Sequence, residues 1–345
     1  MEHRERASAP RTVCLIPGDG IGPEITEAAR RVLRAAGANI DWIELPAGAA
    51  AAKTHGDVLP DETLEALKTH RVGLKGPLTT PIGKGFASVN VKMRQQLELY
   101  AAVRPVRSMP GIKTRYDNVD LVVIRENTEG LYSGIENEIV PGVVQSLKIA
   151  TRKGIERIAR FAFDYILRRG RHKLTVFHKA NIMKMSDGLF LDCVRRIHRD
   201  LAPRVELEEM IIDNACMQLV RDPSRFDVMV MENFYGDVVS DLCAGLVGGL
   251  GVVPGANIGD DCAIFEAVHG SAPDIAGRGA ANPLALIMSA TMMLNHIQET
   301  DAARRVKAAY DAVLERRNPA DLTPDIGGRG TTMGFAEAIV REIER

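Results

Sequence analysis

The sequence predicts an α/β protein, and three observations lead to that class. A short apolar run at 12–17 passes through a glycine-rich turn at 18–22 into a segment with apolar residues at helical spacing, which is how an α/β unit begins. Four later apolar runs each pass into charged residues and Asn, as strands do in a sheet that helices cover. At 345 residues, the chain suggests two domains, or one large α/β unit with an insertion.

The expected elements follow one another along the chain. Strands are expected at 12–17, 120–127, 173–181, 207–214 and 227–233. Helices are expected at 25–36, 155–168, 283–298, 302–316 and 333–344. The first of these helices ends at Gly37, a residue suited to the left-handed conformation that terminates helices.

One segment, at 135–151, interrupts the alternation of strands and helices. It contains two short β-prone runs hinged on Pro141-Gly142, which predicts a hairpin. Two interpretations have equal weight on spacing alone: a hairpin packed on its own domain, or an arm that pairs with a second subunit.

Composition excludes several classes of protein. With 44 basic and 45 acidic residues the net charge is −1, so no overall charge favours nucleic acid, and no apolar run is long enough to span a membrane. The first twelve residues have neither the apolar core of a secretory signal nor the composition of a convincing transit peptide. The five cysteines form no CxxC pair and are expected to be free thiols in a reducing compartment, the cytoplasm or, in a eukaryote, the mitochondrial matrix.

Charged residues follow four of the expected strands. Arg125, Lys179, Asp213 and Asp237 lie at or shortly after strand ends. In open α/β sheets, ligands bind just beyond the carboxyl ends of the strands. These four residues therefore predict a site that combines a metal with an anion.

Asp237 and Asp241 are the most informative pair. They lie one helical turn apart after an apolar run, so both carboxylates can reach one hard cation. The alternative for an isolated DxxxD pattern is a solvated helix face. The other strand-end residues favour the cation site.

Three arginines favour a substrate with several carboxylates. Arg94 and Arg104 share the segment 88–107, and Arg125 ends the next strand. A guanidinium binds a carboxylate through two parallel hydrogen bonds, although each arginine taken alone is more often a surface residue.

Other residues are open to two interpretations. Lys179 is a surface lysine or a base beside cations, and Tyr132 is a core phenol or a proton donor. The glycines at 18, 20 and 22 do not have the dinucleotide-binding spacing and indicate an ordinary strand-to-helix turn. Asp274, in the polar loop at 265–283, would accept hydrogen bonds from a ribose diol and repel a 2′-phosphate.

Several motifs, in order, resemble the metal-dependent β-decarboxylating dehydrogenases that act on isocitrate, homoisocitrate and isopropylmalate. The motifs are LIPGDGIGPE, GLKGPLTTPIG, SVNVKMR, LYAAVRPV, IRENTEGLYSGIE, HKANIMKMSDGLF, NFYGDVVSDLCAGLVGGLG and HGSAPDIAG, and the resemblance runs from about residue 12 to the end. Among the members, NAD-dependent isocitrate dehydrogenases are the most similar.

The resemblance implies a fold and an assembly. The fold is the isocitrate/isopropylmalate dehydrogenase-like α/β fold, not a Rossmann fold, with a discontinuous large domain (1–103 and 256–345) and a smaller domain (104–255). The smaller domain carries a clasp at about 135–151 that joins two subunits, which favours the arm interpretation. Lys179 and Asp213 then complete the active site of the neighbouring subunit of a homodimer.

The resemblance also implies roles for individual residues. Tyr132 and Lys179 are catalytic, and Asp213, Asp237 and Asp241 hold Mg²⁺ or Mn²⁺. Isocitrate is bound by Ser88, Asn90, Arg94, Arg104 and Arg125. NAD⁺ is bound by Leu78, Thr80, Asn181, His269, Gly270, Ala272, Asp274, Ile275 and Asn282. A phosphate on Ser88 would repel substrate carboxylates, so regulation at this residue is a hypothesis.

The substrate and cofactor follow from two short segments of the resemblance. Ser88 and Asn90 are short and polar, whereas isopropylmalate relatives have aliphatic side chains there and homoisocitrate relatives commonly have an Arg. Asp274-Ile275 replaces the Lys and Tyr of NADP-dependent relatives. The expected reaction is oxidative decarboxylation of isocitrate to 2-oxoglutarate with NAD⁺, and the alternatives are a homoisocitrate or 3-isopropylmalate dehydrogenase, or a non-catalytic regulatory paralogue.

Overall fold

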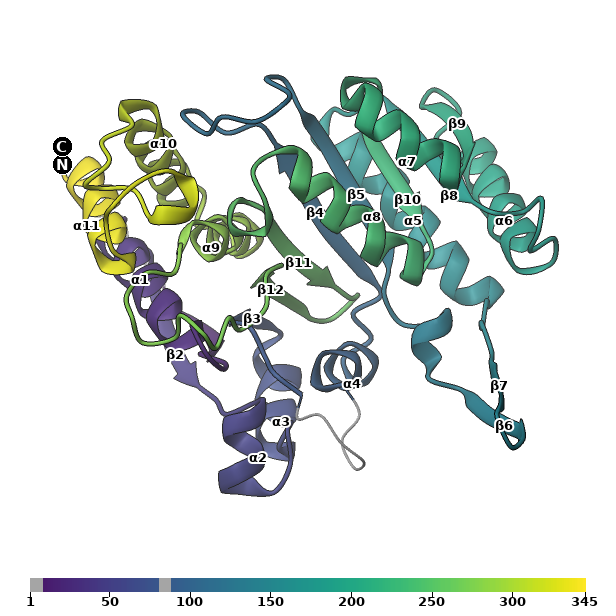
Figure 1. Ribbon diagram of the computed structural model, residues 1–345, viewed down its shortest axis with the longest axis horizontal. Coiled ribbons are helices and arrows are strands. Elements are labelled where there is room, and N and C mark those ends of the chain that lie inside the picture. Colours follow the sequence, from purple (N-terminus) through teal and green to yellow (C-terminus); the bar gives the residue numbers. More distant parts are fainter. Residues whose placement is uncertain (1–8, 81–87) are drawn as a thin grey trace, which may run out of the picture.

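A single large sheet organises the molecule (Figure 1). The computed structural model describes residues 9–80 and 88–345. Within these residues, ten strands form the sheet in the order β2 (Ile40–Glu44), β1 (Arg11–Ile16), β3 (Val72–Lys75), β12 (Ala263–Ala267), β11 (Pro254–Ile258), β4 (Ala101–Arg107), β5 (Asp120–Glu126), β10 (Val228–Met231), β8 (Lys173–His178) and β9 (Glu206–Ile211).

The sheet has two parallel halves joined by antiparallel strands. Strands β2, β1, β3 and β12 are parallel to one another, as are β5, β10, β8 and β9. Between the halves, β11 pairs antiparallel with β12 and β4, and β4 pairs antiparallel with β5. The predicted domain boundaries, after residues 103 and 255, fall inside β4 and β11, and the division into domains stays a prediction.

Helices cover both faces of the sheet, as the apolar strands predict. Their bounds are α1 (Gly22–Ala35), α2 (Ala49–His55), α3 (Asp61–His70), α4 (Val89–Gln96), α5 (Arg152–Arg169), α6 (Ser186–Leu201), α7 (Ile212–Arg221), α8 (Asn233–Leu246), α9 (Leu284–His296), α10 (Thr300–Arg316) and α11 (Thr332–Ile343). One continuous core joins one face to α1 and α7–α11, while α5 and α6 cover the other face of one half and α2–α4 that of the other half.

The alternation of side chains along each strand explains this layering. In β5, Leu121 and Val123 belong to the core beneath α8, whereas Val122 and Ile124 belong to the core beneath α5 and α6. Successive side chains of a strand point to opposite faces of the sheet, and both sets are buried because helices cover both faces. The expected helices and strands form, but the strand expected at 207–214 ends at Ile211, and residues 212–214 begin α7.

The four strands that carry the predicted site residues are neighbours. Because β5, β10, β8 and β9 are parallel and adjacent, their carboxyl ends lie along one edge of the sheet. Arg125 is the penultimate residue of β5, and Lys179 follows β8. Helix α7 begins directly after β9, and α8 begins one residue beyond β10. The predicted placement of charged residues at one edge is confirmed.

The expected hairpin forms and extends away from the rest of the chain (Figure 1). Strands β6 (Glu136–Val140) and β7 (Val143–Ser146) pair only with each other and are exposed along their whole length. Ile139 and Val144 are 61% and 68% exposed, which is unusual for large apolar side chains of a folded chain.

All five cysteines are unpaired, and four of them are buried. Within the described residues, no helix combines the length and apolar character that crossing a bilayer requires.

Candidate active site

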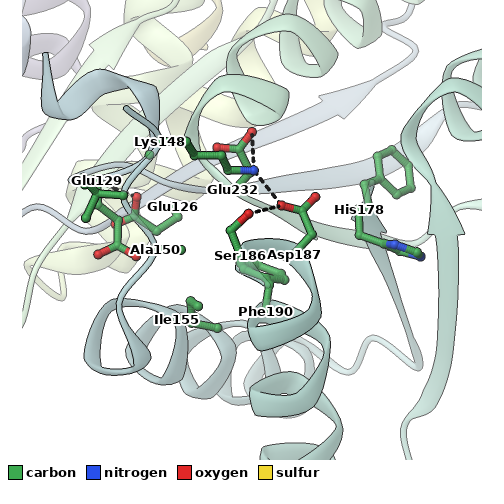
Figure 2. A pocket seen from close by; sticks show the side chains of 13 residues that line it. Glu126, Glu129, Lys148, Ala150, Ile155, His178, Ser186, Asp187, Phe190 and Glu232 are labelled. Carbon is green, nitrogen blue, oxygen red and sulfur yellow. Dashed lines mark hydrogen bonds and ion pairs between the residues drawn. The ribbon is translucent and has the colours of Figure 1, made fainter. Parts of the chain in front are cut away.

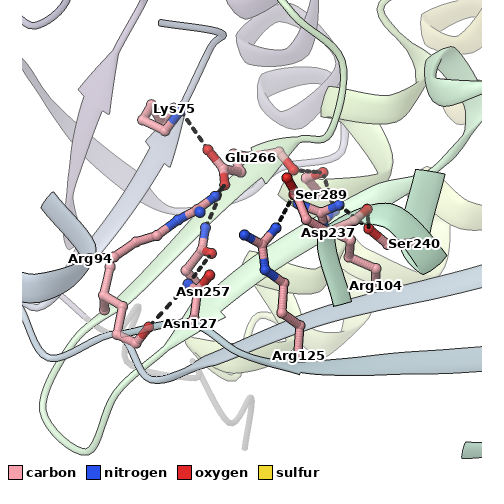
Figure 3. Close-up of polar contacts among 12 residues, drawn as sticks. Lys75, Arg94, Arg104, Arg125, Asn127, Asp237, Ser240, Asn257, Glu266 and Ser289 are labelled. Atoms are coloured by element: carbon pink, nitrogen blue, oxygen red, sulfur yellow. Dashed lines mark hydrogen bonds and ion pairs between the residues drawn. The ribbon is translucent and has the colours of Figure 1, made fainter. Parts of the chain in front are cut away.

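Arg125 lies at the centre of a polar cluster between β5 and α8 (Figure 3). Its side chain is 1% exposed, and its Nε and Nη2 atoms donate to Oδ1 of Asn233 at 3.0 and 2.7 Å. Its Nη1 atom donates to a carboxylate oxygen of Asp237. Helix α8 allows this approach because residue 236 is glycine: a Cβ there would lie 2.4 Å from Cγ of Arg125.

Tyr132 completes this part of the cluster. Its hydroxyl donates to the second oxygen of Asp237, and the Arg125 guanidinium lies 5.0 Å from the centre of its ring. Burial and the adjacent Asp237 carboxylate raise the pKa of Tyr132. The phenol therefore keeps its proton at neutral pH, which a proton donor needs.

Arg104 extends from β4 to the next turn of α8. It is 7% exposed, its Nη1 atom donates to Oγ of Ser240, and the same atom lies 3.4 Å from Oδ1 of Asp241. The arginines are thus buried, whereas the side chains of Asp237 and Asp241 are 41% and 57% exposed. Ligands can reach the two carboxylates.

The three predicted arginines lie in one polar cluster (Figure 3). Burial, and then the charges of Arg125 and Arg94, lower the pKa of Arg104 to about 10. Burial and then Arg94 also lower the pKa of Arg125. Like charges disfavour one another's charged state only when they are close. The cluster therefore has the positive charge that a ligand with several carboxylates requires.

The chemistry of Asp237 and Asp241 fits a divalent cation. Burial raises the pKa of Asp241, opposed by Arg104, and Asp237 adds to the rise. For Asp237, burial is outweighed by Arg125, so its pKa is lowered. Two neighbouring carboxylates that repel each other and remain accessible suit a hard cation. Among the described residues, however, no three His, Cys, Asp or Glu side chains group to hold a metal, so the chain supplies two of the three predicted ligands here.

A buried hub around Glu266 was not predicted. Its carboxylate accepts from Nζ of Lys75 at 2.5 Å, from Nδ2 of Asn257 at 2.6 Å and from Nη2 of Arg94 at 3.4 Å (Figure 3). Burial raises its pKa, but Lys75 and Arg94 outweigh burial, so the net shift is downward and Glu266 stays ionised. The sequence contained one indication of this hub: Glu266 and Lys75 are each the charged residue of an otherwise apolar strand.

The predicted substrate residues of α4 lie at its first turn. Ser88 precedes the helix and is exposed, whereas Oδ1 of Asn90 is buried without a hydrogen-bond partner among the described residues. The N–H group of Val89 donates to Oγ1 of Thr80 at 3.0 Å. Residues 81–87, which include the end of the GLKGPLTTPIG motif and lie just before SVNVKMR, are outside the described residues.

Lys179 and Asp213 form a separate pair. Nζ of Lys179 lies 2.6 Å from Oδ1 of Asp213, with the side chains 27% and 70% exposed. Within the single chain its ammonium group faces a carboxylate, and the role of Lys179 in the site of a neighbouring subunit stays a prediction. The hydrogen bond from Lys179 lowers the pKa of Asp213.

The loops predicted to bind the cofactor come together around Asp19. Oδ2 of Asp19 accepts from the N–H groups of Ala49 and Thr79 at 2.9 and 2.8 Å, and Oγ1 of Thr79 lies 2.7 Å from Oγ of Ser271. A Cβ on Gly20 would lie 1.9 Å from the carbonyl oxygen of Ser271. The glycine-rich turn therefore packs the loop at 76–80 against the loop at 268–283.

Individual cofactor residues differ in how they are held. Asn282 is buried, and its side chain bonds both Asp325 and the N–H group of Leu284 at 2.9 Å. Nε2 of His269 is buried without a partner among the described residues, and burial lowers its pKa, so a neutral ring is favoured. Asp274 is exposed. Of the others, Leu78, Thr80, Ala272 and Ile275 are half-buried, and Gly270 and Asn181 are exposed.

Comparisons with known proteins identify the family. The family model described as isocitrate/isopropylmalate dehydrogenase matches residues 12–339. Catalytic subunit 5 of the mitochondrial NAD isocitrate dehydrogenase of Arabidopsis thaliana is 51% identical, over 96% of this chain and 88% of that protein. The chloroplastic 3-isopropylmalate dehydrogenase of Solanum tuberosum is 52% identical, over 87% of this chain and 84% of that protein.

A solved structure shares the whole fold. The crystal structure of isocitrate dehydrogenase from Methylococcus capsulatus superposes with a TM-score of 0.93 at 50% identity, over 97% of this chain and 100% of that chain. The resemblance seen in the motifs is therefore confirmed along the whole chain, and the protein belongs to the isocitrate/isopropylmalate dehydrogenase family.

Proposed function

We propose that this protein catalyses the NAD⁺-dependent oxidative decarboxylation of isocitrate to 2-oxoglutarate and CO₂. The proposal rests on two buried arginines, Arg104 and Arg125, that contact the accessible carboxylates of Asp241 and Asp237, with the charge of Arg94 nearby. Relatives about half identical to this chain are named NAD isocitrate dehydrogenases, which supports the same activity.

The arginines bind the substrate's carboxylates. Arg104 and Arg125 are held by Ser240 and Asn233, so their planar groups are oriented before the substrate arrives. Arg94 is held by Glu266 at 3.4 Å. Asn90, with its unpaired amide oxygen, and the exposed Ser88 lie at the start of α4, where they recognise the substrate's remaining polar end.

Asp237 and Asp241 hold Mg²⁺ or Mn²⁺ together with Asp213 of a second subunit. A metal held there would supply a Lewis acid for the substrate's hydroxyl and for the negative charge left by CO₂. NAD⁺ held by the loop at 268–283 would supply the hydride acceptor. The chain's own residues move the protons: Lys179 of the second subunit takes the hydroxyl proton at Nζ, and Tyr132 returns one through its hydroxyl to the carbon that has lost CO₂.

Cofactor choice depends on the loop at 268–283. Asp274 is exposed at this loop and carries a negative charge, which accepts hydrogen bonds from a ribose diol and repels a 2′-phosphate. The neutral His269 and the anchored Asn282 lie along the same loop. These features favour NAD⁺ over NADP⁺.

The assembly is a homodimer with shared active sites. The exposed hairpin β6–β7 and the exposed Ile182, Met185 and Val238 provide apolar surface for a second copy of the chain. In the single chain, Lys179 pairs with Asp213 whereas Tyr132 bonds Asp237, which supports a site shared between two chains.

A substrate-by-cofactor panel tests the proposal. We expect kcat/KM for isocitrate with NAD⁺ to exceed that for homoisocitrate, 3-isopropylmalate or NADP⁺ by on the order of 100-fold, and EDTA to abolish NADH formation. A higher kcat/KM for 3-isopropylmalate, the compound in the name of the Solanum tuberosum relative, would show that this compound and not isocitrate is the substrate. Metal-dependent activation of an added partner subunit, without turnover by the protein alone, would establish a regulatory paralogue.

A further inference from the structure

Asp187, in the first turn of α6, is buried and charged, and no role described above uses it. It is 3% exposed. Its Oδ1 atom accepts from Nζ of Lys148 at 2.6 Å, and its Oδ2 atom accepts from the backbone N–H group of Lys179 at 2.7 Å. The hydroxyl of Tyr235 lies 3.4 Å from Oδ2. A buried carboxylate with both oxygens engaged is held firmly in one place.

The backbone of Lys179 is fixed at both of its polar groups. Its N–H group donates to Asp187, and its carbonyl oxygen accepts from the N–H groups of Ile182 and Met183, each at 2.9 Å. The carbonyl oxygen of Met183 in turn accepts from the N–H group of Asp187 at 3.1 Å. Much of the turn between β8 and α6 is exposed, with Met185 90% exposed, whereas Ala180 and Met183 are half-buried. Asp187 is therefore its inward anchor.

Lys148 connects this anchor to the helix that carries the metal ligands. Besides Asp187, its ammonium group lies 3.8 Å from a carboxylate oxygen of Glu232 (Figure 2). It also lies 4.9 Å from the ring centre of Tyr235. Glu232 accepts from the N–H groups of Phe234 and Tyr235, each at 3.2 Å, and so caps the start of α8. The anchor of Lys179 is thus held against the base of α8.

We propose that Asp187 is a positioning residue that sets where the Lys179 ammonium group reaches. The inference rests on the proposed function, in which Lys179 transfers a proton in the second subunit's site. A lysine side chain is long and flexible, so its reach depends on where its Cα atom is held. A displacement of about 1 Å at a reacting group can lower the rate about 100-fold.

Two variants test this role. The first variant, Asp187→Asn, keeps an oxygen that can accept from the Lys179 N–H group. The second, a double variant that combines Lys148→Met with Asp187→Ala, removes that acceptor and does not leave the Lys148 ammonium group buried without a partner. Asp192→Asn is the matched control, because Asp192 lies on the exposed side of the same helix.

We expect kcat of the double variant to fall about 100-fold with KM for isocitrate within about threefold, because proton transfer is impaired more than binding. Asp187→Asn should recover much of the loss, and Asp192→Asn should match the wild type.

Hydrogen exchange of peptides covering 178–186 gives a readout that does not depend on turnover. We expect these peptides to exchange at least about tenfold faster in the double variant, with Asp187→Asn intermediate. Peptides from α10, far along the sequence, should be unchanged.

The outcomes separate the two proposals. A kcat within threefold of the wild type, or a slow variant whose 178–186 peptides exchange as in the wild type, would overturn the role of Asp187. If active-site titration shows that the fall in kcat comes from a smaller fraction of folded enzyme, the role of Asp187 is also overturned. If the wild type forms no NADH from isocitrate, the proposed function is wrong, and hydrogen exchange still decides whether Asp187 holds Lys179.

Discussion

The two charged clusters along the sheet edge differ in how completely one chain builds them. Around Arg125, the arginines are buried, bonded by Asn233, Ser240 and Asp237, and already close to one another. The Lys179–Asp213 pair is exposed, and these two charged groups bond each other. The first cluster is preorganised within the chain, whereas the second is fixed at the Lys179 backbone but presents its charges outward, as a contribution to another subunit would require.

The largest expected effect is at the first cluster. Asp237→Asn should lower kcat/KM on the order of 10³-fold, since it removes a predicted metal ligand and the charge that balances Arg125. Steady-state kinetics and Mn²⁺ binding by electron paramagnetic resonance measure the change. The control is Asp301→Asn, because Asp301 forms an exposed ion pair with Arg304 on α10. Unchanged Mn²⁺ affinity in Asp237→Asn would show that Asp237 is not a metal ligand.

Mixing two inactive variants tests whether the second cluster serves another subunit. Co-expressed Lys179→Ala and Asp237→Asn chains should regain about a quarter of wild-type activity, because random pairing makes half of the dimers mixed and each of these has one complete site. Each variant alone should stay inactive. Absence of recovery in dimers shown to be mixed would place Lys179 and Asp237 in the same chain's site.

A smaller effect should follow from crowding Arg125. Gly236→Ala places a Cβ 2.4 Å from its Cγ atom, so we expect the KM for isocitrate to rise on the order of tenfold as the guanidinium shifts. Gly245→Ala, on the same helix, meets nothing within 4 Å and should leave the KM unchanged. Equal behaviour of the two variants would show that the position of Arg125 does not limit binding.

The smallest effect is expected at the exposed pair. In Lys179→Met, the pKa of Asp213 should rise toward its ordinary value, because the hydrogen bond from Lys179 is what lowers it. Because the pKa of Asp213 is lower in the folded than in the unfolded chain, the pair stabilises the fold at pH values above the unfolded pKa. That stabilisation is lost as the pH falls through the folded pKa. For so exposed a pair it is small, so the urea midpoint at pH 7 should not change. Carboxyl NMR titration measures the pKa, and an unchanged value would mean that the pair does not persist in solution.

The sequence predicted elements whose signals are local. The strands at 120–126 and 228–231 and the hairpin around Pro141-Gly142 follow from apolar runs and turn residues, and the helix spacing of Asp237 and Asp241 follows from one turn of α8. Arg125, Lys179 and Asp213 could be placed at strand ends for the same reason. Glu266 and Lys75 stand out as charged residues of apolar strands, but the sequence could not show that Lys75 and Arg94 meet Glu266, because both lie far from it along the chain.

The sequence alone determined the family, the residue types of the site and the edge of the sheet where they lie, because periodicity and motif order are written along the chain. Only the tertiary structure decided which of these residues meet: that Arg125 passes over Gly236 to Asp237, and that Lys179 pairs with Asp213 instead. The reason is physical. Which charges face each other depends on strand order and on the burial that holds each side chain, and neither is a property of the local sequence.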